Sequence, residues 1–175
     1  FADPGHQFHS LGGILATGYG VFDNCVNKGK ITFNNSNGTK YRRTGGIVGC
    51  VGSDAGLGYT LRMTNCRNEA DIAASTASVG GLIGNCAAAV NRCAVMDTTV
   101  SGTSKIGGLI GMTGKTVNES YALHVTVTAA GDYAGGLVGG YCASTITSCF
   151  ARGTVMGDGY VGGLIGNGVS SSSSP

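Results

Sequence analysis

The feature that most constrains the fold of this chain is a glycine-rich phrase that returns at regular intervals. The phrase joins two glycines, two aliphatic residues and a further glycine, as in "GGIVG", "GGLIG" and "GGLVG". The first glycines of the pairs are Gly12, Gly45, Gly80, Gly107, Gly135 and Gly162. The intervals between them are 33, 35, 27, 28 and 27 residues. A near-constant period of this length indicates stacked structural repeats.

The residues between these phrases predict β-strands. Each unit continues with a small polar turn and then a short alternating segment, such as "GKITF", "TTVSG", "VTVTA" or "GTVMG". Alternation with β-branched residues is typical of strands, and no segment shows helical apolar spacing. We therefore predict an all-β chain. The expected fold is a β-solenoid (β-helix) of about six rungs, with roughly 27 residues and three short strands per rung.

The repeated glycines have a structural interpretation in such a stack. Neighbouring rungs lie about 4.8 Å apart, and glycines at fixed positions permit sharp turns and close approach of the chains. A dinucleotide-binding fingerprint would require a strand–helix unit around the glycines, and the sequence has none. The repeat glycines are Gly45, Gly46, Gly80, Gly81, Gly107, Gly108, Gly135, Gly136, Gly162 and Gly163.

Composition narrows the classes of function. Charged residues make up 11% of the chain and the formal net charge is +2, which argues against a nucleic-acid partner. No apolar run reaches the roughly 18 residues of a membrane span. The sequence lacks C-x-x-C and HExxH patterns, so we expect no metal and no cofactor. Only nine acidic residues are present, and Asp132 and Asp158 fit corner turns better than a glycosidase pair, so we expect no enzyme.

The chain divides into an N-terminal arm (1–11), the solenoid (12–167) and a serine-rich tail or linker (168–175). It begins with Phe1 rather than Met, so we expect a processed chain or a fragment. The unit that begins at Gly162 lacks its later strands, which leaves an open edge. Two explanations stay open: further rungs of the same chain, or head-to-tail stacking of copies into a fibre.

The phrases "GGIVG", "GGLIG" and "GGLVG" resemble the GLUG motif, a glycine–leucine–hydrophobic–glycine repeat. The resemblance covers roughly residues 45–167, with a weaker copy, "LGGILATG", at 11–18. GLUG repeats occur in bacterial surface adhesins and in secreted IgA-specific metallopeptidases, where they are an accessory region outside the zinc site. The resemblance therefore implies an architecture, and no catalytic residue carries over.

Seven cysteines favour an oxidising compartment. Three units carry two cysteines each, and the unit that starts at Gly107 carries none, with Met112–Gly114 and Ser120 in the two places. Joint presence or absence predicts bonds within a unit. The predicted pairs are Cys50–Cys66, Cys86–Cys93 and Cys142–Cys149, and Cys25 is left unpaired or forms a bond between chains. Two alternatives stay open: bonds between equivalent cysteines of adjacent rungs, and reduced thiols throughout.

The long first interval holds a basic loop at residues 28–43. Its basic residues could contact an acidic glycan, or could simply face solvent; they are Lys28, Lys30, Lys40, Arg42 and Arg43. Three N-glycosylation patterns begin at Asn34, Asn37 and Asn118.

These observations predict an extracellular or cell-surface structural and adhesive protein: a stalk, a surface adhesin segment or a self-assembling filament subunit. Its partners would be further copies or further rungs. The alternative is a glycan-binding module that uses the basic loop against a host or matrix glycan. A carbohydrate-active β-helix enzyme is a third reading, which the scarcity of acids disfavours.

Overall fold

The computed structural model describes residues 8–34, 41–51, 62–140, 142 and 145–168. Every regular element in these ranges is a β-strand, and the strands form four sheets in which all pairs are parallel. This confirms the all-β prediction. The parallel sheets are consistent with a β-helix or solenoid. Among the described residues no helix could cross a membrane.

The first sheet contains the strands that lead into the glycine pairs, and the second contains the strands that follow them. The first sheet consists of β1 (Phe8–Gly12), β6 (Tyr41–Gly45), β11 (Ser78–Gly80), β16 (Ile106–Gly107), β20 (Ala134–Gly135) and β24 (Val161–Gly162). The second sheet consists of β2 (Leu15–Gly18), β7 (Val48–Val51), β12 (Ile83–Cys86), β17 (Ile110–Thr113) and β21 (Val138–Gly140).

The third sheet is short and the fourth is wide. The third sheet consists of β3 (Val21–Asp23), β8 (Arg62–Thr64), β13 (Ala89–Asn91), β18 (Val117–Asn118) and β22 (Ile146–Thr147). The fourth consists of β4 (Val26–Asn27), β5 (Ile31–Phe33), β9 (Arg67–Asn68), β10 (Ile72–Ala74), β14 (Ala94–Met96), β15 (Thr99–Gly102), β19 (Tyr121–Ala129) and β23 (Phe150–Met156).

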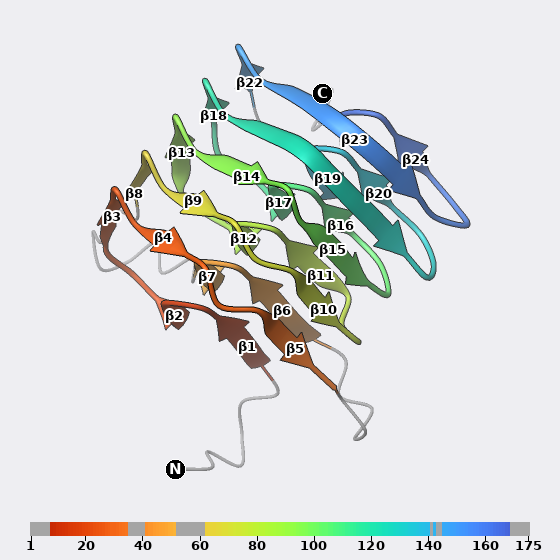
Figure 1. Ribbon diagram of the computed structural model, residues 1–175, viewed down its shortest axis with the longest axis horizontal. Helices are drawn as coiled ribbons and strands as arrows, with labels where there is room; N and C mark the ends of the chain where they lie inside the picture. Colours follow the sequence, from red (N-terminus) through yellow and green to blue (C-terminus); the bar gives the residue numbers. More distant parts are fainter. Residues whose placement is uncertain (1–7, 35–40, 52–61, 141, 143–144, 169–175) are drawn as a thin grey trace, which may run out of the picture.

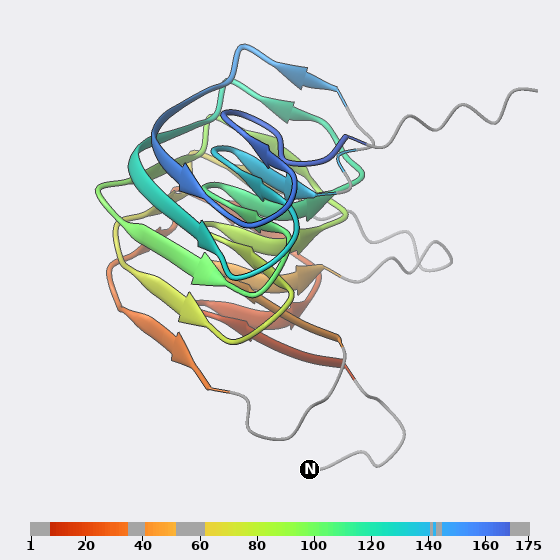
Figure 2. The ribbon, with the colours of Figure 1, turned by 90° about the vertical axis from the view of Figure 1, so that its right-hand side faces the viewer.

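The chain passes through the four sheets in the same order and then returns to the first. We call one such passage a circuit; the third circuit runs from β11 to β15. Successive circuits stack in chain order, from the red end to the blue end in Figures 1 and 2. The strand β1 pairs with β6 from Phe8 onward, so part of the predicted arm belongs to the first circuit.

A circuit contains more strands than the sequence predicted. The third circuit has five short strands rather than three, because left-handed residues divide what reads as a continuous segment. Arg92, with φ 51°, separates β13 from β14, and Asp97, with φ 52°, separates β14 from β15. In the next circuit His124, with φ 54°, lies inside the single long strand β19, where the pairing with β23 shifts register.

Stacked aliphatic side chains fill the interior. Leu82, Leu109 and Leu137 are fully buried at equivalent positions of three circuits. Their backbones are directly linked: the Leu82 amide donates to the Leu109 carbonyl (2.8 Å), and the Leu109 amide to the Leu137 carbonyl (3.0 Å). The aliphatic pairs of the central glycine phrases thus form one part of the core of the stack.

Each glycine of a pair faces a different close neighbour. A Cβ on Gly107, the first of its pair, would overlap the carbonyl oxygen of Ile110 and lie 2.7 Å from the Gly139 nitrogen. A Cβ on Gly81, the second of its pair, would overlap the Gly108 carbonyl oxygen and lie 2.7 Å from Cγ1 of Val95 on the fourth sheet. The first glycine therefore permits the turn into the second sheet, and the second permits close packing across the interior.

Candidate functional site

A column of cysteine and serine side chains lines the corner between the third and fourth sheets. It contains, in successive circuits, Cys25, Cys66, Cys93, Ser120 and Cys149. The residues that follow them pair in register, from Val26 with Arg67 up to Tyr121 with Phe150. We call this set the corner column.

The residue before each member of the corner column has a left-handed backbone. The φ angles lie between 48° and 55° at Asn24, Asn65, Arg92, Glu119 and Ser148. Asparagine tolerates this conformation because its short polar side chain can bond locally, whereas it is costly for longer side chains. The same kink in every circuit turns the chain from one sheet to the next and interrupts the backbone ladder there.

The corner column carries the hydrogen bonding across this interruption. Within a circuit, the side chain donates to the carbonyl two residues earlier: Cys93 Sγ to Asn91 at 3.2 Å, and Ser120 Oγ to Asn118 at 2.8 Å. Between circuits, the Cys93 amide donates to Ser120 Oγ at 3.0 Å, and the Cys66 amide to Cys93 Sγ at 3.4 Å. A thiol and a hydroxyl therefore serve the same purpose at this position.

A second interchange of this kind occurs after the second sheet. Cys86 Sγ donates to the Ala88 carbonyl (3.1 Å) and accepts from the Ala88 amide (3.3 Å). Thr113, which pairs with Cys86 in register, makes the same two bonds to Lys115 at 3.0 and 3.1 Å. Burial raises the pKa of the Cys86 thiol to about 12, so this thiol stays protonated and able to donate.

These contacts differ from the predicted disulfide pairing. Cys50, Cys66, Cys86, Cys93 and Cys149 carry free thiols, so none of the pairs 50–66, 86–93 and 142–149 is formed. Cys66 has Cys93 and Cys25 as its sulfur neighbours instead, in the adjacent circuits. In the Gly107 unit, Thr113 and Ser120 make the hydrogen bonds that cysteines make in other circuits. The joint absence of two cysteines therefore does not require a disulfide within the unit.

The corner column gives a direct stability test at Ser120, which is fully buried. Replacing Ser120 by alanine leaves the Cys93 amide without its partner, whereas the Asn118 carbonyl keeps its bond from the Arg92 amide. We expect a loss of about 1–2 kcal/mol in the free energy of unfolding. Ser120→Cys should stay close to wild type because neighbouring circuits already use cysteine there. Urea unfolding followed by circular dichroism measures both variants. Equal losses in the two would contradict the interchange.

The thiols of the corner column differ in proton affinity. A hydrogen bond from Cys93 lowers the pKa of Cys66 to about 7. The same contact, together with burial, raises the pKa of Cys93. Burial raises the pKa of Cys25, and the charge of a neighbouring Cys66 thiolate adds to this. Burial also raises the pKa of Cys149. Cys66 is thus the thiol that ionises most readily among these four.

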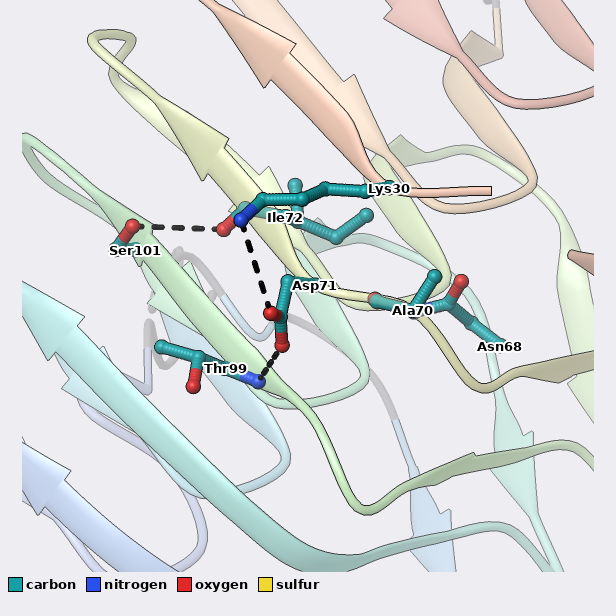
Figure 3. Close-up of polar contacts among 7 residues, drawn as sticks. All are labelled: Lys30, Asn68, Ala70, Asp71, Ile72, Thr99 and Ser101. Atoms are coloured by element: carbon teal, nitrogen blue, oxygen red, sulfur yellow. Dashed lines mark hydrogen bonds and ion pairs between the residues drawn. The ribbon is translucent and has the colours of Figure 1, made fainter. Parts of the chain in front are cut away.

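The basic residues of the predicted glycan contact lie apart and have partners. Lys28 pairs with Glu69 at 3.3 Å, and Lys30 reaches Asp71 at 4.0 Å. Figure 3 shows Asp71 between Lys30 and Thr99, whose amide donates to the Asp71 carboxylate at 2.8 Å.

The two arginines belong to another sheet. Arg42 and Arg43 lie on β6, where Arg42 lies over the Phe33 ring (5.3 Å) and Arg43 bonds Cys50 Sγ (2.9 Å). Lys40 lies outside the described residues. The four described residues of the predicted glycan contact therefore contact other groups of the chain, two in the turn between β4 and β5 and two on β6.

The glycosylation patterns lie in unlike surroundings. Asn34 is exposed directly after β5, and Asn37 lies outside the described residues. Asn118 lies on β18, where its amide donates to the Glu119 carboxylate at 3.3 Å. Asn118 and Glu119 also border an open polar groove of about 430 Å³ along the third sheet, which Arg62 and Arg92 line as well.

The exposed apolar side chains gather at the two ends of the stack. Among the described residues, the large exposed apolar side chains of the first circuit are Ile14, Val21 and Val26. Those of the last circuits are Phe150, Met156, Tyr160 and Val161. A cavity of about 450 Å³ lies at this second end, lined in part by Ala151, Val155 and Val161.

Strand edges are open at the same two ends. At one end the outermost strands are β1, β2, β3, β4 and β5, and at the other they are β21, β22, β23 and β24. After β24 the described chain adds a bridge between Val138 and Ile165, so the second end is stepped rather than flat. Tyr160 stacks on Tyr133 at this end, with ring centroids 5.2 Å apart, and Phe150 stacks on Tyr121 at 5.0 Å.

Comparisons with known proteins add no relative: no protein-family model, no curated protein and no solved structure matches this chain. The resemblance to GLUG repeats therefore stays a prediction from the motif. Within the described residues no group of three or more histidine, cysteine, aspartate or glutamate side chains could hold a metal ion.

Proposed function

We propose that this chain is a β-solenoid of five complete circuits and a sixth begun, and that it serves outside the cell as a structural subunit whose copies stack end to end. The observation that carries the proposal is the confinement of large exposed apolar side chains to the two ends. In a monomer whose end circuits are capped, such side chains would be buried in the core. In a subunit that stacks end to end, they are needed at the surfaces where copies meet.

Both ends of the stack present apolar side chains on their inward faces. The inward face of the first circuit includes Leu15, Phe22 and Ile31, and that of the last includes Ile146, Val155 and Ile165. All strands run in parallel with a common spacing, so a second copy would continue both the backbone ladders and the apolar interior. The stepped second end would fix the rotation of the added copy.

The proposed interface between copies is heterologous, unlike the isologous interface of a closed dimer. The surface at the first circuit meets the unlike surface at the last circuit, so each added copy exposes a new end. Such a heterologous contact produces an extended stack. A rigid stalk or filament is the natural use of this geometry, and the corners of each circuit stay available for contact with a matrix.

The proposal is tested by electron microscopy of the purified protein, with static light scattering for mass. We expect wild-type fibres, and we expect Val161→Lys to give single particles, because a lysine at an open edge opposes strand pairing and burial. Thr103→Lys, at an exposed position between β15 and β16, is the matched control and should still form fibres. Single particles of wild type over a range of concentrations would contradict the proposal.

A further inference from the structure

Three thiols of the corner column lie in consecutive circuits: Cys25, Cys66 and Cys93. From their positions we propose that Cys25 and Cys66 form a disulfide that joins the first two circuits, with Cys25 reacting first with the oxidant and Cys66 completing the bond. This bond would tie the open first circuit to the one above it. It does not depend on end-to-end stacking.

The backbone places the two residues at a suitable separation. The Arg67 amide donates to the Cys25 carbonyl at 2.8 Å, and Val26 pairs with Arg67 in register. Equivalent residues of adjacent strands lie about 4.8 Å apart. Disulfides span Cα separations of about 4.4–6.8 Å, so the bond needs side-chain rotation and little backbone movement.

Accessibility selects Cys25 as the first thiol to react. Cys66 and Cys93 are 1% and 0% exposed, whereas Cys25 is only partly covered because its circuit is the first of the stack. An oxidant in solution therefore reaches Cys25 before the other two. Cys149 in the last described circuit of the column is covered to a similar, intermediate degree.

The lowered pKa of Cys66 makes it the thiol that reacts second, as the attacking thiolate. The bond from Cys93 lowers the pKa of Cys66 to about 7, so a large share of Cys66 is thiolate near neutral pH. The thiolate is the attacking species in thiol–disulfide exchange. Cys93 keeps its proton because its pKa is raised, and it is the donor that stabilises the Cys66 thiolate.

The chemistry is two successive exchanges with a small-molecule disulfide, such as oxidised glutathione. The Cys25 thiolate attacks one sulfur of the reagent, which forms a Cys25–glutathione mixed disulfide and releases one glutathione thiolate. The Cys66 thiolate then attacks Cys25 Sγ, which forms the Cys25–Cys66 bond and releases the second glutathione thiolate. Two protein thiols lose two electrons and two protons, and one molecule of oxidised glutathione becomes two of reduced glutathione.

The chain contains its own control at Cys149. Its neighbour in the circuit below is Ser120, whose hydroxyl cannot complete an exchange. Burial raises the pKa of both Cys149 and Cys25, so their first reactions have similar requirements. A mixed disulfide should therefore persist at Cys149 and be short-lived at Cys25.

The test uses the reduced, folded protein incubated with oxidised glutathione, quenched in acid and analysed by peptide mass spectrometry without reduction. We expect a linked Cys25–Cys66 peptide pair, lighter by two hydrogen masses than the free pair, and a stable glutathione adduct on Cys149. In Cys66→Ser, which keeps a corner hydroxyl as at Ser120, the adduct on Cys25 should accumulate instead.

Three outcomes would overturn the inference. One is a persistent glutathione adduct on Cys25 of the wild-type protein. Another is a linkage of Cys66 to Cys93 or Cys50 rather than to Cys25. The third is modification of Cys149 with Cys25 left unreacted. Circular dichroism of Cys66→Ser establishes that the variant is folded, and Cys149→Ser should leave the Cys25–Cys66 bond unchanged.

Discussion

Replacing Gly107 by alanine should abolish the native fold or destabilise it by about 4 kcal/mol or more, an exceptionally large effect for one methyl group. The added Cβ would overlap the Ile110 carbonyl oxygen and lie 2.7 Å from the Gly139 nitrogen. Both are backbone atoms held in parallel ladders, so no side chain can rotate away to make room. Gly107 also lies in a central circuit, where movement would disturb neighbours on both sides.

The matched control is Gly114→Ala. Gly114 is exposed after β17, and a Cβ there would have no atom within 4 Å. We expect the free energy of unfolding to change by no more than about 1 kcal/mol, since alanine restricts the unfolded chain and this offsets any small loss in the folded one. Urea unfolding monitored by circular dichroism compares the midpoints. A Gly107→Ala protein as stable as Gly114→Ala would show that the glycine pairs are not sterically required.

The second large effect is expected at Asn68, which is fully buried. Its amide nitrogen donates to the Ala70 carbonyl (2.8 Å), and its oxygen accepts from Asn27 Nδ2 in the circuit below (2.7 Å). Asn68→Val removes both bonds: the Ala70 carbonyl loses its donor, and Asn27 Nδ2 keeps only its bond to the Gly29 carbonyl. We expect a loss of about 2–3 kcal/mol, since each unsatisfied buried group costs about 1–3 kcal/mol.

A double variant separates hydrogen bonding from packing. Asn68 pairs in register with Val95 of the next circuit, and Val95 pairs with Ala122 of the circuit after that. An apolar side chain is therefore compatible with the geometry at this position. Asn27→Val/Asn68→Val removes both partners of the Asn27–Asn68 bond, and its loss should be smaller than the sum of the two single losses. Strict additivity of the two losses would contradict a coupled amide pair.

The glycine phrases are the part of the sequence from which the fold class was predicted most directly. Their period and the alternating segments between them led to an all-β chain, and the parallel sheets confirm that class. The number of strands per circuit was wrong. Arg92 adopts a left-handed backbone although arginine rarely does so, because the stacked circuits impose the corner; aspartate, as at Asp97, tolerates this conformation better.

The cysteines show where the sequence supports more than one interpretation of a site. Joint loss of two cysteines in one unit fits a bond within that unit, yet Ser120 and Thr113 take over the hydrogen bonds of two separate corners. The signal in the sequence was the chemical kind of the replacement, a hydroxyl in both places. The basic residues were likewise grouped by sequence, whereas folding pairs Lys28 with Glu69 across two circuits.

The sequence by itself determined the repeating unit, because a period of glycine pairs and β-branched alternation is a local property of the chain. It also indicated residues that fill the interior, since the aliphatic pairs of the central phrases are buried between circuits. Tertiary structure alone decided which residues of different circuits meet. Cys66 lies beside Cys25 and Cys93, and Asn68 above Asn27, because parallel in-register pairing brings together residues that are dozens of positions apart.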